Sequence, residues 1–169
     1  FSTPGRVAAF LAEPIQGVGG TTHGAPSYLR LAYETIREHG GLCIADEVQT
    51  GFGRTGTNYW GFQNSDAEPD MVVMAKGFGN GVPIGAIVAK PEIAARLVPG
   101  THAATYGGNP LVCAAGVAVF ETIEEDGLLE KATAIGAYAV EKLNTLAAGC
   151  DLIDHIRGKT LYNTLRSLD

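Results

Sequence analysis

GLCIADEVQTGFGR, at residues 41–54, is the stretch of the 169-residue chain that decides its fold. Its apolar run, Leu42 to Ala45, has no helical periodicity and lies between a glycine pair and a glycine-rich loop. This pattern predicts a buried strand of a parallel sheet. Two carboxylates, Asp46 and Glu47, follow the strand directly. Because open α/β sheets bind ligands beyond the carboxyl ends of their strands, an acid at this place is well positioned for chemistry.

Two further apolar stretches end in an ionisable residue. Residues 71–75 are followed by Lys76, and residues 7–12 are followed by Glu13. The carboxyl ends of parallel strands meet at one edge of a sheet, so an anionic group and an amine are expected to face one ligand there. The lysine and Asp46 are therefore the first candidates for catalytic residues.

The remaining elements complete an α/β pattern. An amphipathic helix beginning at Pro26 and ending at Gly40 joins the first two strands as a βαβ unit. Residues 84–89 predict a strand antiparallel to its predecessor, and Asn109 followed by Pro110 predicts a helix start. The helix after it is apolar nearly all round, so we expect it to be buried. The predicted fold is α/β, with a mixed, mostly parallel sheet and helices on both faces.

Composition and charge exclude several functions. The net charge of −6 argues against nucleic acid as a partner. No apolar run is long enough to span a bilayer, so we expect no membrane association. The four histidines show no ligand spacing, so we expect no metal.

The cysteines bear on the compartment. Cys43, Cys113 and Cys150 are widely spaced in apolar segments, which predicts buried free thiols in a reducing compartment. We therefore expect a cytoplasmic location, with the mitochondrial matrix as the alternative if the source is eukaryotic. The chain enters a strand soon after Phe1, so we also expect it to be a fragment.

Two nucleotide-binding interpretations fail on their context. LCIADE fits a Walker B strand, but the G-x-x-x-x-G-K-[ST] loop that this needs is absent upstream. GFGNG at residues 77–81 follows a strand as a dinucleotide-binding loop does. However, Pro83 and a further strand occupy the place where that motif needs a helix.

An electron-sink cofactor such as pyridoxal phosphate fits the candidate residues better. It needs an amine for a Schiff base, a carboxylate for the pyridine nitrogen and donors for its phosphate. Lys76, Asp46 and the helix start at Thr105 and Asn109 can supply these groups. Spacing alone leaves the plain alternatives open, namely a surface lysine and an aspartate that caps a turn.

Four long segments occur in a fixed order along the chain. They are EPIQGVGG (residues 13–20), CIADEVQTGFGRTG (43–56), PDMVVMAKGFGNGVPIGAIVA (69–89) and THAATYGGNPLVCAAG (101–116). Together they resemble the class III (subgroup II) aminotransferases of pyridoxal-phosphate fold type I. The resemblance covers residues 7 to about 146, and it implies the central part of the large, cofactor-binding domain.

The resemblance implies catalytic roles for two residues. Lys76 is expected to be the Schiff-base lysine and then the general base of the proton shift. Asp46 is expected to pair with the pyridine nitrogen of pyridoxal 5'-phosphate. The GFGRTG loop and Gly107-Gly108 are expected to shape the wall of the active site.

The resemblance also implies four supporting positions. Val48 is expected to pack on the cofactor ring, and Gln49 to hydrogen-bond the ring hydroxyl. Thr105 is expected to bind the phosphate across the interface of a homodimer. Glu13 is expected to be a supporting acid near the cofactor, with a strand-end cap as the alternative.

The sequence departs from the family pattern at two places. Members that act on ornithine-type amines often carry an acid where this chain has Val18, which favours the alanine–glyoxylate branch, although residues 101–116 resemble acetylornithine aminotransferases. The final residues, TLYNTLRSLD, do not continue the family pattern. We therefore expect residues 1–159 to be a partial large domain and residues 160–169 an atypical tail.

The predicted function is transfer of an amino group from an amino acid or ω-amine to a 2-oxo acid. A non-catalytic fragment or pseudoenzyme that keeps the fold is the alternative. Because parts of the expected site lie outside the 169 residues, we expect the isolated chain to be inactive.

Overall fold

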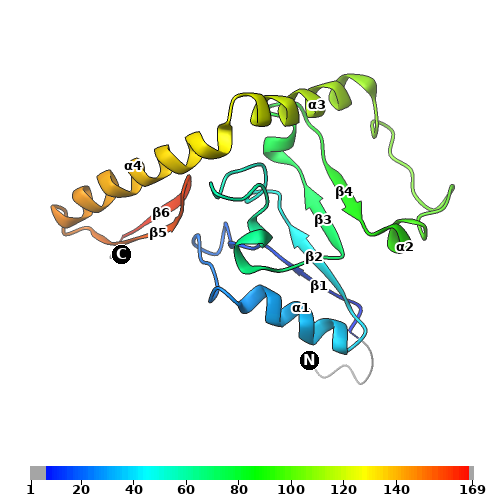
Figure 1. Cartoon of the computed structure of the whole chain (residues 1–169), viewed down its shortest axis with the longest axis horizontal. Helices are drawn as coiled ribbons and strands as arrows, with labels where there is room; N and C mark the ends of the chain where they lie inside the picture. Colours follow the sequence, from blue (N-terminus) through cyan, green and yellow to red (C-terminus); the bar gives the residue numbers. More distant parts are fainter. Residues whose placement is uncertain (1–6, 168–169) are drawn as a thin grey trace.

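The computed structural model describes residues 7–167, and four strands form its central sheet (Figure 1). The strands, in their order across the sheet, are β1 (Ala9–Ala12), β2 (Leu42–Asp46), β3 (Met71–Met74) and β4 (Ala86–Ala89). Strands β1, β2 and β3 are parallel, and β4 pairs antiparallel with β3. The predicted α/β fold with a mixed, mostly parallel sheet is confirmed.

Helix α1 (Tyr28–Glu38) covers one face of this sheet. Its Leu29 and Tyr33 are buried against Cys43 of β2, as the apolar side of the predicted amphipathic helix requires. On the opposite face Leu11 of β1 is 59% exposed. Of the two helix layers expected from the sequence, the described residues therefore provide the α1 layer.

Two long helices follow the sheet, α3 (Pro110–Glu125) and α4 (Leu128–Ala148). The predicted start of α3 is confirmed, since the Asn109 side chain accepts a hydrogen bond from the Val112 N–H. The prediction that this helix is buried is wrong for the described residues: Leu111 is 77% exposed. Helix α3 packs along one side, against α4, the turn after β3 and aromatic side chains of the loop after β2, so its other apolar side chains face outward.

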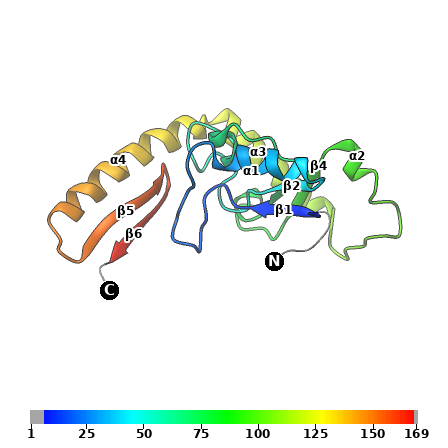
Figure 2. The same cartoon turned by 90° about the horizontal axis from the view of Figure 1, so that it is seen from below.

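A β-hairpin forms the C-terminal part of the described chain. Strands β5 (Ile153–Lys159) and β6 (Tyr162–Ser167) pair antiparallel and lie beside α4, away from the central sheet (Figures 1 and 2). The sequence predicted no element after residue 159. The domain boundary proposed there stays a prediction.

Three short elements complete the fold. They are η1 (Gly61–Ser65), η2 (Lys76–Phe78) and α2 (Pro91–Ala94). Of the cysteines predicted to be buried, Cys43 is buried, whereas Cys150 is half-buried and Cys113 is exposed on α3. None of the helices in the described part of the chain combines the length and the hydropathy needed to cross a bilayer.

Candidate active site

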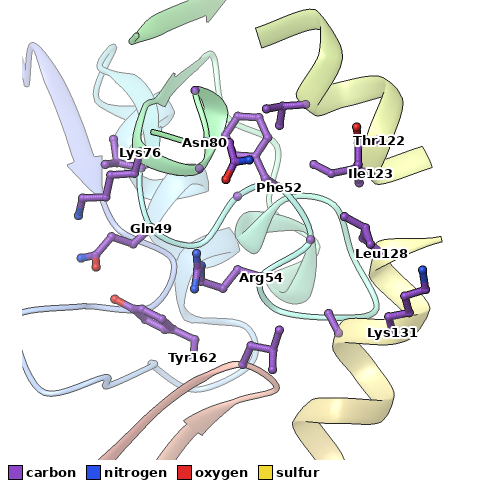
Figure 3. Close-up of a pocket in the computed structure, with 18 of the residues that line it drawn as sticks. Gln49, Phe52, Arg54, Lys76, Asn80, Thr122, Ile123, Leu128, Lys131 and Tyr162 are labelled. Atoms are coloured by element: carbon purple, nitrogen blue, oxygen red, sulfur yellow. The ribbon is translucent and has the colours of Figure 1, made fainter. Parts of the chain in front are cut away.

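A cavity of about 860 Å³ opens at the carboxyl end of β3. Three of the predicted site residues, Val48, Gln49 and Lys76, line it together, although they come from two different loops (Figure 3). The side chains of Arg54 and Tyr162 extend toward the same side of the cavity as Gln49. The edge of the sheet where ligands were expected is therefore hollow, and its lining combines apolar side chains with a few polar ones.

Lys76 has a strained backbone and a free side chain. Its φ of 47° lies in the left-handed region, which costs a residue other than glycine about 1–3 kcal/mol. The turn is held by hydrogen bonds from the Phe78 N–H to the Ala75 carbonyl and from the Gly79 N–H to the Lys76 carbonyl. Its amine forms no ion pair with a carboxylate of residues 7–167. This combination is typical of a functional residue.

The loop after β2 is anchored by a buried carboxylate. Glu47 is fully buried and accepts hydrogen bonds from the Thr50 hydroxyl at 2.7 Å and from the N–H groups of Gly61 and Phe62 at 2.8 Å. Burial raises the pKa of Glu47, and these three donors oppose that shift. Since every donor belongs to the loop itself, Glu47 shapes the wall of the cavity.

A cluster of aromatic rings packs beside the cavity. Phe52 stacks on Phe78 with ring centroids 5.6 Å apart, and both rings contact Phe120 of α3. A Cβ on Gly116 would lie 2.9 Å from the Phe78 ring, so the helix offers a glycine where the ring approaches. The cluster thereby fixes the loop after β2 to the turn that carries the lysine.

Asp46 lies at a second cavity, of about 700 Å³, which Glu13 also lines. Its Oδ1 accepts a hydrogen bond from the Val48 N–H at 3.0 Å. Glu13 Oε2 accepts from the Gly17 N–H at 3.0 Å and faces Gln49 Nε2 at 3.5 Å. Gln49, which lines the first cavity, is therefore joined through Glu13 to the second cavity, where Asp46 lies.

Other predicted positions lie apart from this neighbourhood. Thr105 and Gly107-Gly108 are exposed and line neither cavity. Val18 is 99% exposed, and it also lines neither cavity. Within the described chain these residues make no contribution to the hollow around the lysine.

Sequence reasoning missed Tyr162 altogether. It belongs to β6, and its hydroxyl is buried with no hydrogen-bond partner among the described residues. A Cβ on Gly17 would overlap both this hydroxyl and Gln49 Nε2, so the three segments meet there. Burial raises the pKa of Tyr162. No local sequence pattern could predict this residue as part of the site, because the pairing of β5 with β6 brings it to the cavity.

The donor set fits a pyridoxal phosphate ring. Among the residues that line the first cavity, Lys76 supplies an amine, Gln49 supplies an amide and Val48 supplies an apolar surface. One carboxylate oxygen of Asp46 has no hydrogen bond to the described residues. A strained lysine at a strand mouth in an α/β sheet, with a carboxylate at the end of the neighbouring strand, is the arrangement that a pyridoxal-phosphate site requires.

The chain belongs to the class-III aminotransferases, since the family model described as Aminotransferase class-III matches residues 2–164. It is 48% identical over 161 residues to "Alanine--glyoxylate aminotransferase 2 homolog 2, mitochondrial" of Arabidopsis thaliana, covering 95% of this chain and 34% of that protein. It is 46% identical over 156 residues to the acetylornithine aminotransferase of Caldanaerobacter subterraneus, covering 92% of this chain and 39% of that protein.

Solved structures agree with this assignment. An ornithine aminotransferase from Toxoplasma gondii, described with partial occupancy of PLP at its active site, superposes with a TM-score of 0.89 at 37% identity. The match covers 94% of this chain and 38% of that one. The chain thus spans between a third and two fifths of the length of these relatives.

Proposed function

We propose that the protein transfers an amino group from an amino acid or ω-amine to a 2-oxo acid, with pyridoxal 5'-phosphate as its cofactor. The observation that carries this proposal is Lys76, which has a strained backbone, forms no ion pair with the described residues and lines a cavity at the strand ends. Membership of the class-III aminotransferases supports it.

When bound, the cofactor supplies an electron sink for the carbon that exchanges its amino group. Lys76 holds the cofactor through its amine and, when released, moves a proton as general base. Asp46 uses its free oxygen to keep the ring nitrogen protonated. Gln49 donates a hydrogen bond to the ring hydroxyl, and Val48 packs on the ring face. Glu13 orients the Gln49 amide by accepting from Nε2.

The position of Thr105 supports a homodimer with a shared site. Thr105 is exposed and lines neither cavity of its own chain, so it is available to bind the phosphate in the partner's site. The exposed apolar side of α3 begins at Leu111, six residues later. An aminotransferase that completes each site from two subunits accounts for both features.

We further propose that the protein works in the cytoplasm, with the mitochondrial matrix as the alternative that the Arabidopsis relative's name supports. The second candidate function, a non-catalytic relative that keeps the fold, is favoured by one observation. The phosphate donors expected from the sequence, Thr105 and the α3 start, line neither cavity of the described residues.

A visible-absorbance scan of the full-length protein with added pyridoxal phosphate, paired with an alanine–2-oxo acid assay, tests the proposal. We expect a visible band and cofactor-dependent turnover. Lys76→Ala should abolish the band and lower turnover by roughly 10²–10⁴-fold or more, the range for loss of a general base. Lys131→Ala, on α4, is the matched control and should keep both. A wild-type protein without band or turnover would establish the non-catalytic alternative.

A further inference from the structure

The C-terminal hairpin has a strained tip that is packed between two other segments. Thr160, a β-branched residue at this tip, has a φ of 56°, in the left-handed region that favours glycine. Its hydroxyl donates a hydrogen bond at 2.8 Å to the Thr55 carbonyl. A Cβ on Gly56 or on Gly136 of α4 would approach Thr160 to 2.8 Å or less, so both segments offer a glycine there. Strain of this kind persists where the surroundings hold the residue, and it is common at functional sites.

The fixed tip directs Tyr162 toward Gln49. The Tyr162 side chain extends from β6 with its hydroxyl on the side of the Gln49 amide (Figure 3). A Cβ built on Gly17 would lie 2.3 Å from this hydroxyl and 2.0 Å from Gln49 Nε2. The two polar groups therefore surround one point beside Gly17, where any larger residue would separate them.

Glu13 is a third polar group beside Gly17. Its Oε2 accepts a hydrogen bond from the Gly17 N–H at 3.0 Å and faces Gln49 Nε2 at 3.5 Å. The second contact is at the outer limit of a hydrogen bond, so Glu13 alone holds the amide weakly. Burial and the charge of Glu13 raise the pKa of Tyr162, so the hydroxyl keeps its proton.

The Tyr162 hydroxyl can connect these groups. It is buried without a hydrogen-bond partner among residues 7–167, which costs stability unless a neighbouring group satisfies it. A tyrosine hydroxyl can accept one hydrogen bond and donate another. Beside Gln49 and Glu13 it can accept from the amide and donate to the carboxylate. A buried polar network in which every member is satisfied is rigid.

We infer that Tyr162 is a positioning residue for Gln49: its hydroxyl accepts a hydrogen bond from Nε2, donates one to Glu13, and so holds the second N–H of the amide toward the ring hydroxyl of the cofactor. The inference rests on the proposed function and deepens it, because it adds the hairpin to the cofactor site. The sequence of residues 160–169 does not continue the family pattern, so the family assignment does not predict this role.

The test measures the dissociation constant of pyridoxal 5'-phosphate from the full-length protein by equilibrium dialysis. Tyr162→Phe removes the hydroxyl and keeps the ring. Tyr33→Phe is the matched control, because Tyr33 also has a buried hydroxyl without a partner among the described residues, and it packs in the core beneath α1. Gln49→Leu removes the amide, and the double variant completes a cycle that isolates the coupling between the two side chains.

Tyr162→Phe should weaken cofactor binding about threefold to tenfold, the range for one lost hydrogen bond. In the Gln49→Leu background the same change should weaken binding less than about twofold, because no amide is left to position. Gly17→Ala should weaken binding at least as much as Tyr162→Phe, since its methyl group would separate the hydroxyl from the amide. Tyr33→Phe should leave the dissociation constant unchanged. Tyr162→Phe should melt within about 2 °C of wild type, because it removes no hydrogen bond among the described residues.

The inference is overturned if Tyr162→Phe keeps the wild-type dissociation constant, or if it weakens binding equally with and without Gln49. A lower melting temperature with unchanged cofactor binding would show that the hydroxyl only stabilises the hairpin. Failure of the proposed function is a separate outcome. A wild-type protein that binds the cofactor but transfers no amino group would contradict the function, and the same cycle would still decide the role of Tyr162. A wild-type protein that binds no pyridoxal phosphate would contradict both.

Discussion

Strands β2 and β3 lie side by side, and the charged residue at their amino ends has more partners than the charged residues at their carboxyl ends. At the amino ends, Asp70 is buried and paired on every side. It accepts hydrogen bonds from the Cys43 N–H at 2.8 Å and from Arg37 at 3.0 Å, and it forms an ion pair with Lys90 at 2.9 Å. Burial alone would raise the pKa of Asp70, but the bonds from Lys90, Cys43 and Arg37 lower it below its usual value.

At the carboxyl ends of the same strands the charges are left available. Lys76 forms no ion pair with the described residues, and Asp46 accepts one hydrogen bond, from Val48. Residues whose charges are fully paired hold the strands in register, whereas residues with unused donors and acceptors can meet a ligand. Both kinds of charged residue lie at strand ends, so position does not distinguish them. The number of hydrogen-bond and ion-pair partners does distinguish a charged residue that stabilises the fold from one that can bind a ligand.

After Lys76→Ala, the largest effect is expected from removing the available carboxylate. Asp46→Ala should lower amino transfer by roughly 10²–10³-fold, the range for one electrostatic stabiliser of the transition state. The fold should survive, since the mutation removes a single hydrogen bond worth about 1 kcal/mol. Steady-state kinetics and circular dichroism of the full-length protein test this, and near-wild-type turnover would remove Asp46 from the chemistry.

The paired carboxylate should behave in the opposite way. Asp70→Ala leaves two cations and a buried N–H without their shared partner, so it should lower the free energy of unfolding by about 3 kcal/mol. Glu68→Ala is the matched control, because Glu68 is 84% exposed and lies 3.9 Å from the same Lys90. That change should cost less than about 1 kcal/mol. Urea denaturation of both variants measures the difference, and equal losses would contradict the comparison.

Lowering the pH should reproduce part of the loss of stability that is expected for Asp70→Ala. Because its pKa is lower in the folded state than in the unfolded state, Asp70 stabilises the fold above about pH 4. That contribution is lost as the pH falls through the folded-state pKa. The free energy of unfolding should therefore decline more steeply on acidification in the wild type than in Asp70→Ala. Parallel slopes for the two proteins would show that Asp70 is not the group that titrates.

Glu47 tests the same principle beside the cavity. Glu47→Gln presents an amide where three donors need an oxygen, so it should cost about 1–3 kcal/mol of stability. Thr50→Val removes one of those donors and should cost about 1 kcal/mol. Thermal unfolding of the two variants measures which of them loses more stability. A Glu47→Gln protein as stable as wild type would show that this carboxylate does not anchor the loop.

Sequence patterns predicted the strands and helices around the site better than they predicted the contacts between distant residues. The apolar runs located β1, β2 and β3, and Asn109-Pro110 located the start of α3, because these signals are local. They singled out Asp46 but could not predict that Glu47 anchors the loop, since two of the donors to Glu47 come from Gly61 and Phe62, far along the loop.

Long-range pairing explains the remaining differences. Tyr162 reaches the cavity only because β6 pairs with β5, and its sequence neighbourhood carries no catalytic pattern. The apolar composition of α3 correctly indicated a surface that favours burial. It could not indicate what covers that surface, and in the described residues Leu111 and Val117 stay exposed.

The smallest effect is expected at Val18. The sequence suggested that an acid here favours ornithine-type donors, but the side chain is 99% exposed and lines neither cavity. Val18→Glu should therefore raise the ornithine-to-alanine ratio of kcat/KM by no more than about threefold, through a screened surface charge. A tenfold rise would show that the loop around Val18 contacts the substrate. In that case residues away from the strand ends would also bind the ligand.

The central claim is that Lys76, the unpaired cation at the strand mouths, holds the cofactor. Borohydride reduction of the cofactor-loaded full-length protein, followed by digestion and mass-spectrometric mapping, tests it most directly. The account predicts that the reduced pyridoxyl group is found on the peptide that contains Lys76. Recovery of the group on Lys90, Lys131 or another lysine would contradict the account.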